Sequence, residues 1–398
     1  MKISFENTRL QENKIAETSV KLEKTIKKLE EIKKKRNWHS EYASILLPEE
    51  KKYLQESNAL VKKHAKATAL IVVGIGGSNL GTIAVSKAVG TKKTLFFADT
   101  VDPDYLNELL HEARKEKLLL NVITKSGSTT ETIALLQFLI KELKIPANKV
   151  IATTSKGSKL EKLAIKEGFG VLYIPEKIGG RYSVFSNVGL FPLSFAGVNT
   201  KKLLEGARKA SLKQAAKLAA VNYLFYKERK IIYNQFYFSK DLEALGKWYL
   251  QLFAESLGKN KLELIPTLSI GSIDLHSTIQ AYLEGANNKN YRVVTTNFKE
   301  KMRIPENKNN DLVPGLQGRE IGSVMHLIAQ AFKKDLENNK KSFIEIELKE
   351  KSELEIGELM QLEMLEVILL AELLKVNAFN QPAVEGYKKE LKKLLQKK

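Results

Sequence analysis

The sequence predicts an α/β protein of two domains, each with a doubly wound parallel sheet between helices, plus extra helices at both ends of the chain. Three observations lead to this prediction. The chain has 398 residues, well past the size at which a single hydrophobic core stops growing. Short β-type runs alternate with amphipathic helical stretches, which is typical of βαβ units in a parallel sheet. Neither half shows a short internal period, which excludes a solenoid.

Four consecutive segments make up the predicted chain. Residues 1–66 are expected to form Lys- and Glu-rich helices in an outer layer, and residues 67–199 the first sheet domain. Residues 200–380 are expected to form the second sheet domain, and residues 381–398 a C-terminal helix. The expected strands are residues 67–74, 94–99, 118–124, 149–154 and 170–175 in the first domain and 230–238, 264–272, 291–297 and 342–348 in the second.

The composition excludes several classes of protein. The chain has no cysteine, which removes disulfides, thiolate metal sites and thiol nucleophiles and fits a reducing compartment. Its first residues, MKISFENTRLQ, lack the basic and apolar regions of a signal peptide, and no run reaches the roughly 18 apolar residues of a membrane helix. We therefore expect a cytoplasmic protein with no membrane partner.

The formal net charge of +19 raises the question of a nucleic-acid partner. Only nine of the 65 basic residues are arginines, and the lysines are spread along the chain and mixed with Glu. Aromatic residues do not interleave with them in the pattern of a base-stacking surface. We expect solvated lysine-rich helix faces that attract small anions, and no nucleic-acid partner.

A hydroxyl-rich loop follows the third predicted strand, in the stretch VITKSGSTTETIALL of residues 122–136. Such a loop between a strand and a helix directs hydroxyls and backbone N–H groups at one point, with the positive end of the helix dipole behind them. Ser128 and Glu131 alone match a helix capping box, which is the simpler interpretation. Capping leaves other polar residues of the loop unexplained, and these suit a phosphate. They are Thr124, Lys125, Ser126 and Thr129.

A glycine-rich turn, IVVGIGGSNLG of residues 71–81, connects the first predicted strand to a helix. Glycines let backbone N–H groups approach a ligand closely, although Gly77 and Ser78 also suit a plain tight turn. A dinucleotide fingerprint is excluded, because its third glycine would fall on Asn79. Since this turn and the hydroxyl-rich loop open at the same edge of the sheet, together they predict a pocket for a phosphate and a sugar.

Two further motifs carry charged side chains. In GGRYS, residues 179–183, an always-charged Arg181 stands behind two glycines, where it suits an anionic site or a plain surface. The stretch of residues 240–260 predicts a helix that ends at Gly258, on which Gln251 and Glu255, four positions apart, point to the same side. The opposite side carries an apolar stripe of Leu242, Leu245, Tyr249, Leu252 and Phe253. By periodicity alone, Glu255 is an ordinary solvated carboxylate.

Two polar motifs in the second half have simple interpretations when taken alone. His276, in GSIDLHSTIQ, lies near the start of a helix, and the five histidines of the chain form no metal-ligand spacing. In NQPAVEGYKKE, Gln381, Glu385 and Lys388 share one face of the C-terminal helix. Spacing alone indicates a structural histidine and an exposed charged face.

Taken together, these motifs resemble the glucose-6-phosphate isomerase family. GIGGSNLG, TKSGSTTET, IGGRYSVFSNVGL, ESLGK, GSIDLHS and FNQPAVEGYK occur in the order, and at roughly the separations, found in that family. The resemblance runs from about residue 70 to the C-terminus. It implies two sugar isomerase (SIS) domains of flavodoxin-like topology, which are αβα sandwiches, and a homodimer active in glycolysis and gluconeogenesis.

The resemblance also implies roles for individual residues. Glu255 would move a proton between carbons 2 and 1 of the sugar, and Arg181 would stabilise the enediolate. His276, reaching the site of the partner subunit, and Lys388 would help to open and close the ring. The 6-phosphate would be held by Thr124, Lys125, Ser126, Ser128 and Thr129. The sugar would be positioned by Gly77, Ser78, Gln251 and Gln381.

The chemistry agrees with these residue types. Isomerising an aldose to a ketose needs a metal for hydride shift or a carboxylate for proton transfer, and without a metal-ligand spacing we expect the carboxylate route, with no metal and no cofactor. An arginine suits the developing charge because it does not lose its proton to the base. The chain departs from the family pattern at Leu257, usually Asn, at Ala383, usually Gly, and at Thr124, usually Ser.

Other functions remain open at this stage. An isomerase of another sugar phosphate, such as one that also accepts mannose 6-phosphate, would share most of these residues. A non-catalytic sugar-phosphate sensor would keep the hydroxyl-rich loop without needing Glu255, His276 and Lys388, all of which are present. A nicotinamide-dependent dehydrogenase requires the glycine spacing that fails at Asn79.

Overall fold

The first half of the chain contains a five-stranded parallel sheet. The computed structural model describes residues 1–306 and 312–396. The sheet has the strand order β3-β2-β4-β5-β6, so that the chain runs outward from β2 in both directions. The strands are β2 (Ala69–Val73), β3 (Thr94–Ala98), β4 (Leu118–Ile123), β5 (Val150–Thr154) and β6 (Gly170–Tyr173). All five lie within the predicted ranges.

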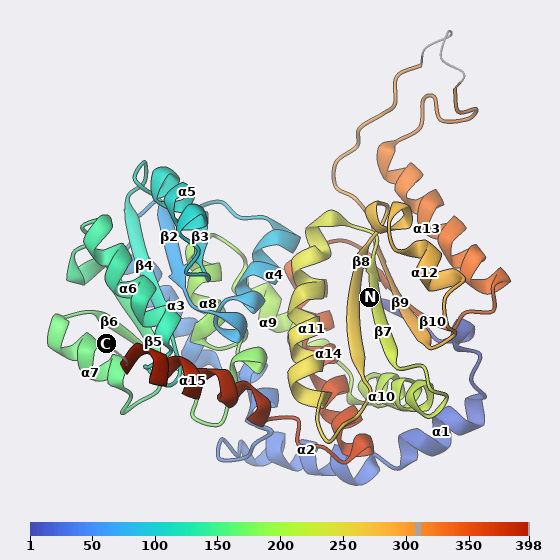
Figure 1. Cartoon of the computed structure of the whole chain (residues 1–398), viewed down its shortest axis with the longest axis horizontal. Coiled ribbons are helices and arrows are strands. Elements are labelled where there is room, and N and C mark those ends of the chain that lie inside the picture. Colours follow the sequence, from blue (N-terminus) through green and yellow to red (C-terminus); the bar gives the residue numbers. More distant parts are fainter. Residues whose placement is uncertain (307–311, 397–398) are drawn as a thin grey trace.

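Helices cover both faces of this sheet, as expected of a doubly wound fold (Figure 1). Alternate residues of β2 enter different cores, because successive side chains of a strand point to opposite faces. Ile71 and Val73 lie in the core of one face, and Leu70 and Val72 in the core of the other. The helices of this half are α3 (Lys51–Lys63), α4 (Leu80–Val89), α5 (Pro103–Ala113), α6 (Thr130–Glu142), α7 (Lys159–Glu167) and α8 (Asn187–Phe195).

The second half contains another five-stranded sheet, in the order β1-β10-β9-β7-β8. Its parallel strands are β7 (Ile232–Tyr237), β8 (Ile265–Ile270), β9 (Lys289–Thr296) and β10 (Phe343–Leu348). The edge strand β1 (Lys2–Ser4) pairs antiparallel with β10. From its composition we expected the N-terminal segment to be helical throughout. Strand β1 shows that it is not. A three-residue strand is too short for its period to show in the sequence.

The helices of the second half pack mainly on one large core. Helix α14 (Glu353–Leu374) is buried along most of its length, and most of its buried side chains are apolar. The other helices are α9 (Thr200–Lys209), α10 (Leu212–Lys227), α11 (Glu243–Leu257), α12 (Ile279–Leu283) and α13 (Ile321–Asn338). The same core includes Ala84 and Val85 of α4 and Tyr182, so the two halves share buried contacts.

The N- and C-terminal helices lie outside the two sheets. Helices α1 (Glu12–Val20) and α2 (Glu23–Lys35) pack beside α10 and its neighbours, with Ile15 and Leu29 in the main core. Helix α15 (Glu385–Gln396) has no buried residue, although Tyr387, Leu394 and Leu395 are apolar. No helix in the described ranges combines the length and apolar character needed to span a bilayer.

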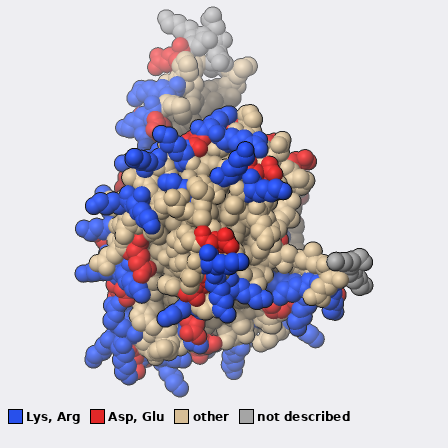
Figure 2. Space-filling view, turned by 90° about the vertical axis from the view of Figure 1, so that its left-hand side faces the viewer, with Lys and Arg blue, Asp and Glu red and all other residues tan. Residues whose placement is uncertain are grey.

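The basic residues are dispersed, as the sequence predicts. Figure 2 shows Lys and Arg around the margins of one face, with Asp and Glu among them and uncharged surface between. On this face the arrangement fits solvated helix faces.

Candidate active site

Arg181 lies at the centre of the candidate site, in the 3-10 turn η5 (Gly180–Tyr182). Its side chain is only 2% exposed, and all five of its N–H groups donate to protein acceptors. The acceptors come from two parts of the chain, the end of α11 and residues 378–381. They are Ser256 Oγ (2.8 Å from Nε), Glu255 Oε2 (3.0 Å from Nη1), Gln381 Oε1 (2.8 Å from Nη1), Ala378 O (2.7 Å from Nη2) and Asn380 O (3.3 Å from Nη2).

Glu255 is the carboxylate that Arg181 meets, and it is held from two sides. Its Oε2 accepts from Arg181, and its Oε1 accepts from Gln251 Nε2 at 2.8 Å, one helical turn earlier on α11. The predicted apolar stripe of this helix is buried, which fixes the opposite face toward the site. The carboxylate keeps a side-chain exposure of 29%, so a substrate has access to it.

The glycine-rich turn packs against both of these groups. A Cβ on Gly77 would lie 2.3 Å from the carbonyl carbon of Gly180, and one on Gly76, which has φ of +60°, would lie 2.9 Å from Gln251 Nε2. Only glycine fits such approaches. Asn79, where the dinucleotide spacing fails, instead donates to Asp99 Oδ2 at 3.0 Å. The turn therefore joins the sheet edge of the first half to Arg181 and Gln251.

The hydroxyl-rich loop leaves the first turn of α6 without a side-chain cap. Thr129 occupies the N-cap position, yet its hydroxyl bonds Thr124 Oγ1 at 2.9 Å and caps no backbone N–H. Ser126 Oγ instead accepts from the backbone N–H and hydroxyl of Ser128. The capping-box interpretation of Ser128 is therefore wrong. The helix N-terminus keeps backbone donors and the positive end of its dipole for an anion.

Lys125 connects this loop to the segment that carries Arg181. Its Nζ donates to the carbonyl of Ile178 at 3.1 Å, three residues before Arg181. Partial burial lowers the pKa of the Lys125 ammonium, because burial disfavours its charged form. An anion in the loop would restore that lost stabilisation, so Lys125 suits a phosphate.

Lys259 is a site residue that the sequence analysis did not single out. Its Nζ donates to the carbonyl oxygens of Ser256, at 2.9 Å, and of Asn377. Burial, and secondarily the charge of Arg181, lowers the pKa of this ammonium to about 8. Lys259 thus ties the end of α11 to the segment that supplies the acceptors of Arg181. Its position in ESLGK, four residues after Glu255, was the available signal.

A cavity of about 630 Å³ lies beside this group, and its size suits a small molecule. Glu255, Lys259 and Gln381 line it, together with Lys261 and Lys375. Cationic side chains therefore surround the approach to the carboxylate. In the described ranges, no three His, Cys, Asp or Glu side chains are grouped to hold a metal ion.

Two predicted catalytic residues, His276 and Lys388, are not joined to Glu255 by any hydrogen bond or ion pair within the described part of this chain. His276 is exposed at the end of the turn η7 (Ile273–His276). Lys388 lies on α15, where its Nζ pairs with Glu385 at 2.8 Å. Of the departures from the family pattern, Leu257 is fully buried in the main core and Ala383 lies in the turn η8 (Pro382–Val384).

Comparison with known proteins decides the family. The sequence profile described as phosphoglucose isomerase matches residues 55–261, which include the glycine-rich turn, the hydroxyl-rich loop, Arg181 and Glu255. This chain belongs to the phosphoglucose isomerase family. A glucose-6-phosphate isomerase of Methanocaldococcus jannaschii is 34% identical over 80% of this chain and 82% of that protein. One of Thermus thermophilus is 32% identical over 85% and 86%.

Solved structures have the same fold as this chain. A hypothetical protein of Thermus thermophilus superposes with a TM-score of 0.90, at 28% identity and 99% coverage of both chains. A glucose-6-phosphate isomerase of Chlamydia trachomatis superposes with a TM-score of 0.80, covering 99% of this chain and 88% of that one. At 20% identity, the second comparison supports the fold alone.

Proposed function

We propose that this protein interconverts glucose 6-phosphate and fructose 6-phosphate. The observation that carries the proposal is the Glu255 carboxylate, held between the Gln251 amide and the Arg181 guanidinium and still open to solvent. Family membership and the names of the relatives support this substrate pair. The reaction would serve glycolysis and gluconeogenesis.

Glu255 is the base of the proposed mechanism. It takes the proton from carbon 2 of the open-chain aldose, and the electron pair of that C–H bond forms the C1–C2 double bond while the carbonyl electrons move to O1. Arg181 stabilises the enediolate. The hydroxyl proton passes from O2 to O1, and Glu255 returns its proton to carbon 1, which leaves a ketone at carbon 2. Atoms and electrons balance without a metal or cofactor.

Substrate must displace one of the bonds that Arg181 makes to protein acceptors. All five donors are in use, so an enediolate oxygen gains one only when an acceptor leaves. Gln381 and Glu255 are the acceptors with side chains that can turn away, whereas Ala378 and Asn380 accept through the backbone. Positioning of the sugar by Gly77, Ser78, Gln251 and Gln381 would accompany this exchange.

The phosphate would bind at the hydroxyl-rich loop. The backbone donors at the start of α6, the hydroxyls of Ser126 and Ser128, and the Lys125 ammonium supply the donors of an anion site. Thr124 and Thr129 bond each other and shape the loop. A dianion here would place the sugar carbons on the Arg181 side, since Lys125 contacts the residue just before that segment.

Proton transfer distinguishes this mechanism from its alternatives. Fructose 6-phosphate would be supplied in D₂O with EDTA, and the product followed by NMR and by a coupled dehydrogenase. We expect conversion that survives the chelator, with solvent deuterium appearing at carbon 2 of the aldose. Transfer of hydrogen between carbons 1 and 2 without incorporation of solvent deuterium would favour a hydride shift. Binding without conversion would favour the sensor.

We further propose a cytoplasmic homodimer in which His276 serves the partner's site and Lys388 its own. His276 is exposed and has no hydrogen bond or ion pair with Glu255 in the described part of the chain, which supports this arrangement. Two inactive variants, Glu255→Gln and His276→Ala, would be refolded together. If His276 crosses between subunits, mixed dimers hold one intact site and activity returns. If it acts within its own chain, the mixture stays inactive.

A further inference from the structure

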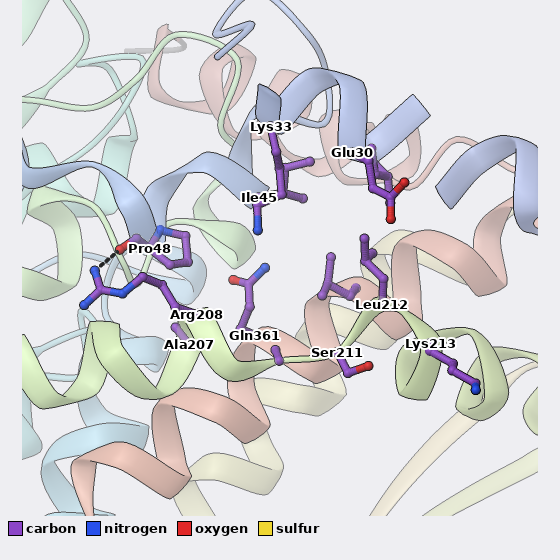
Figure 3. A pocket seen from close by; sticks show the side chains of 13 residues that line it. Glu30, Lys33, Ile45, Pro48, Ala207, Arg208, Ser211, Leu212, Lys213 and Gln361 are labelled. Atoms are coloured by element: carbon purple, nitrogen blue, oxygen red, sulfur yellow. Dashed lines mark hydrogen bonds between the residues drawn. The ribbon is translucent and has the colours of Figure 1, made fainter. Parts of the chain in front are cut away.

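A cavity of about 340 Å³ between α2, the turn η2 (Ala43–Glu49) and α14 contains a buried amide (Figure 3). Gln361 Oε1 has no hydrogen-bond partner among the described residues. Figure 3 shows Arg208 and Lys213 on opposite sides of this amide and directed away from it, so the two cations do not share a ligand. The buried hydroxyls at the end of β5, beside the hydroxyl-rich loop, form a more complete arrangement.

The last two residues of β5 are threonines, and both are fully buried. Because successive side chains of a strand point to opposite faces, their hydroxyls have different partners. Thr153 Oγ1 accepts from Asn121 Nδ2 at 2.8 Å, within the sheet. Thr154 Oγ1 donates to the carbonyl of Thr124 at 2.6 Å, at the start of the hydroxyl-rich loop. Of these two side chains, that of Thr154 is the one bonded to the loop.

Thr154 stands in the middle of a chain of hydrogen bonds. A threonine hydroxyl has one proton, and Thr154 gives it to the Thr124 carbonyl. The 2.8 Å bond between Thr154 Oγ1 and Ser158 Oγ must therefore use the proton of Ser158. Ser158 Oγ in turn accepts from the backbone N–H of Glu161 at 3.0 Å, as the N-cap of α7. The direction of every bond in the chain is thus determined, and bonds in such a chain strengthen one another.

The hydroxyl-rich loop also lies directly on the first turn of α7. Gly127 has φ of +68°, and a Cβ there would lie 2.5 Å from Leu160 N and 3.0 Å from Lys159 N. Only glycine fits this approach. The backbone N–H of Thr124 donates to the carbonyl of Thr153 at 3.1 Å. The position of the loop therefore depends on β5 and α7 as well as on α6, the helix that follows it.

The bond from Thr154 orients one peptide group of the loop. The peptide between Thr124 and Lys125 is trans, so its N–H points opposite to its C=O. Since Thr154 holds the C=O, the backbone N–H of Lys125 points to the side away from Thr154. This N–H has no acceptor among the described residues. It is therefore available to a ligand in the loop.

We propose that Thr154 is a positioning residue for phosphate binding. Its hydroxyl holds the peptide between Thr124 and Lys125 in the orientation that presents the Lys125 N–H to the phosphate, and Ser158 holds that hydroxyl in place. This inference rests on the proposed function, because it takes the substrate's phosphate to lie in the hydroxyl-rich loop. It adds residues of β5 and α7 to those that the sequence motifs indicated.

Thr154→Val tests the proposal, because it keeps the shape of the side chain and removes the hydroxyl. Calorimetric titration with inorganic phosphate would measure a dissociation constant without turnover, and initial rates would measure KM and kcat for fructose 6-phosphate. We expect the dissociation constant and KM to rise together by roughly three- to tenfold, the factor that one net hydrogen bond supports, with kcat unchanged. Thr154→Ser keeps the hydroxyl and should restore both values.

Thr153→Val is the matched control, because it makes the same change at the neighbouring and equally buried position. It should lower the melting temperature about as much as Thr154→Val does and leave phosphate binding unaltered. If Thr154→Val does not fold, Thr154→Ala takes its place. Phosphate binding that the Thr154 variants do not alter, or that Thr153→Val weakens equally, overturns the proposal.

Failure of the proposed function would give a different result. If the wild type binds phosphate but does not convert fructose 6-phosphate, the proposed function is wrong, and the titration of the Thr154 and Thr153 variants still decides the role of Thr154. If the wild type converts fructose 6-phosphate and Thr154→Val has the same KM, the role of Thr154 is wrong and the proposed function stands.

Discussion

Two buried arginines of this molecule meet carboxylates in different ways. Arg181 meets one carboxylate, Glu255, which is 29% exposed, and all its donors are paired. Arg292, on β9, meets two carboxylates of α14, Glu363 at 3.3 Å and Glu366 at 2.5 Å, both with side chains that are fully buried. The first group has balanced charges and access to solvent, and the second has neither.

The Arg292 cluster has two carboxylates against one guanidinium, and a proton on Glu363 removes the excess negative charge. Burial is the main cause that raises the pKa of Glu363 to about 8, and the charge of Glu366 raises it further. The cluster still leaves Arg292 Nε and one oxygen of each carboxylate without a partner among the described residues. The Glu255 carboxylate is thus open to a substrate, whereas the carboxylates of the Arg292 cluster are closed to one.

Removing the proposed base, Glu255, should have the largest effect on activity. Glu255→Gln keeps the shape and the bond from Arg181 but cannot accept a proton. We expect kcat to fall by roughly 10²–10⁴-fold with an unchanged melting temperature. Glu243→Gln, a partly buried carboxylate at the start of the same helix that pairs with Lys240 and Lys247, is the matched control and should keep full activity. Comparable activity in the two variants would show that Glu255 is not the base.

Removing the Arg292 cation tests how much the buried cluster contributes to stability. Arg292→Met leaves the Glu366 carboxylate, beside a protonated Glu363, buried without its cation, which typically costs about 3–5 kcal/mol of unfolding free energy. Urea denaturation would measure it. Adding Glu366→Gln to Arg292→Met should recover part of the loss, since it removes one buried charge. If Arg292→Met alone were as stable as the wild type, Glu363 and Glu366 would both have to be neutral already.

Lys125 tests whether the hydroxyl-rich loop holds the phosphate. Lys125→Met removes one charge-assisted bond, worth about 1.5–3 kcal/mol, so KM for fructose 6-phosphate should rise roughly 10- to 100-fold. Initial rates over a range of substrate concentrations would measure it. Lys141→Met, in the last turn of α6, is the control. A fall in kcat with constant KM would place the phosphate elsewhere.

The proton in the Arg292 cluster predicts a pH dependence of stability. Because the pKa of Glu363 is about 8 in the folded chain against an ordinary 4.5, the folded chain binds more protons between these values. Unfolding free energy should therefore fall as pH rises from 4.5 toward 8, by at most about 1.4 kcal/mol per pH unit from this group. Denaturation curves at several pH values, compared with Glu363→Gln, should show a flatter dependence in the variant. Equal slopes would contradict the assignment.

Lys259 should produce the smallest effect. Its pKa of about 8 predicts that the charge beside Arg181 and Glu255 is lost at mildly alkaline pH, with a several-fold fall in kcat above that value. Lys259→Arg keeps its charge at alkaline pH, so the fall in kcat should occur at a higher pH in this variant. A profile that is the same in both proteins would assign the limb to another group.

The sequence predicted what depends on local pattern. The nine parallel strands of the described ranges have the expected positions, because burial on both faces leaves continuous apolar runs, and the Gln251–Glu255 pair follows from helical spacing. The sequence did not indicate Arg292, Lys259 or Gln361 as special. Their properties depend on neighbours from distant segments, such as α14 for Arg292, and a single sequence gives no measure of which polar residues will be buried together.

The bonds of Arg181 also bear on the order in which the protein becomes active during synthesis. Arg181 and Glu255 are translated early, yet three of the five acceptors around the guanidinium come from residues 378–381. Both sheets and helix α14 precede that segment. A nascent chain can therefore complete its two sheets while Arg181 still lacks most of its acceptors, and the site becomes whole only when residues 378–381 have also left the ribosome.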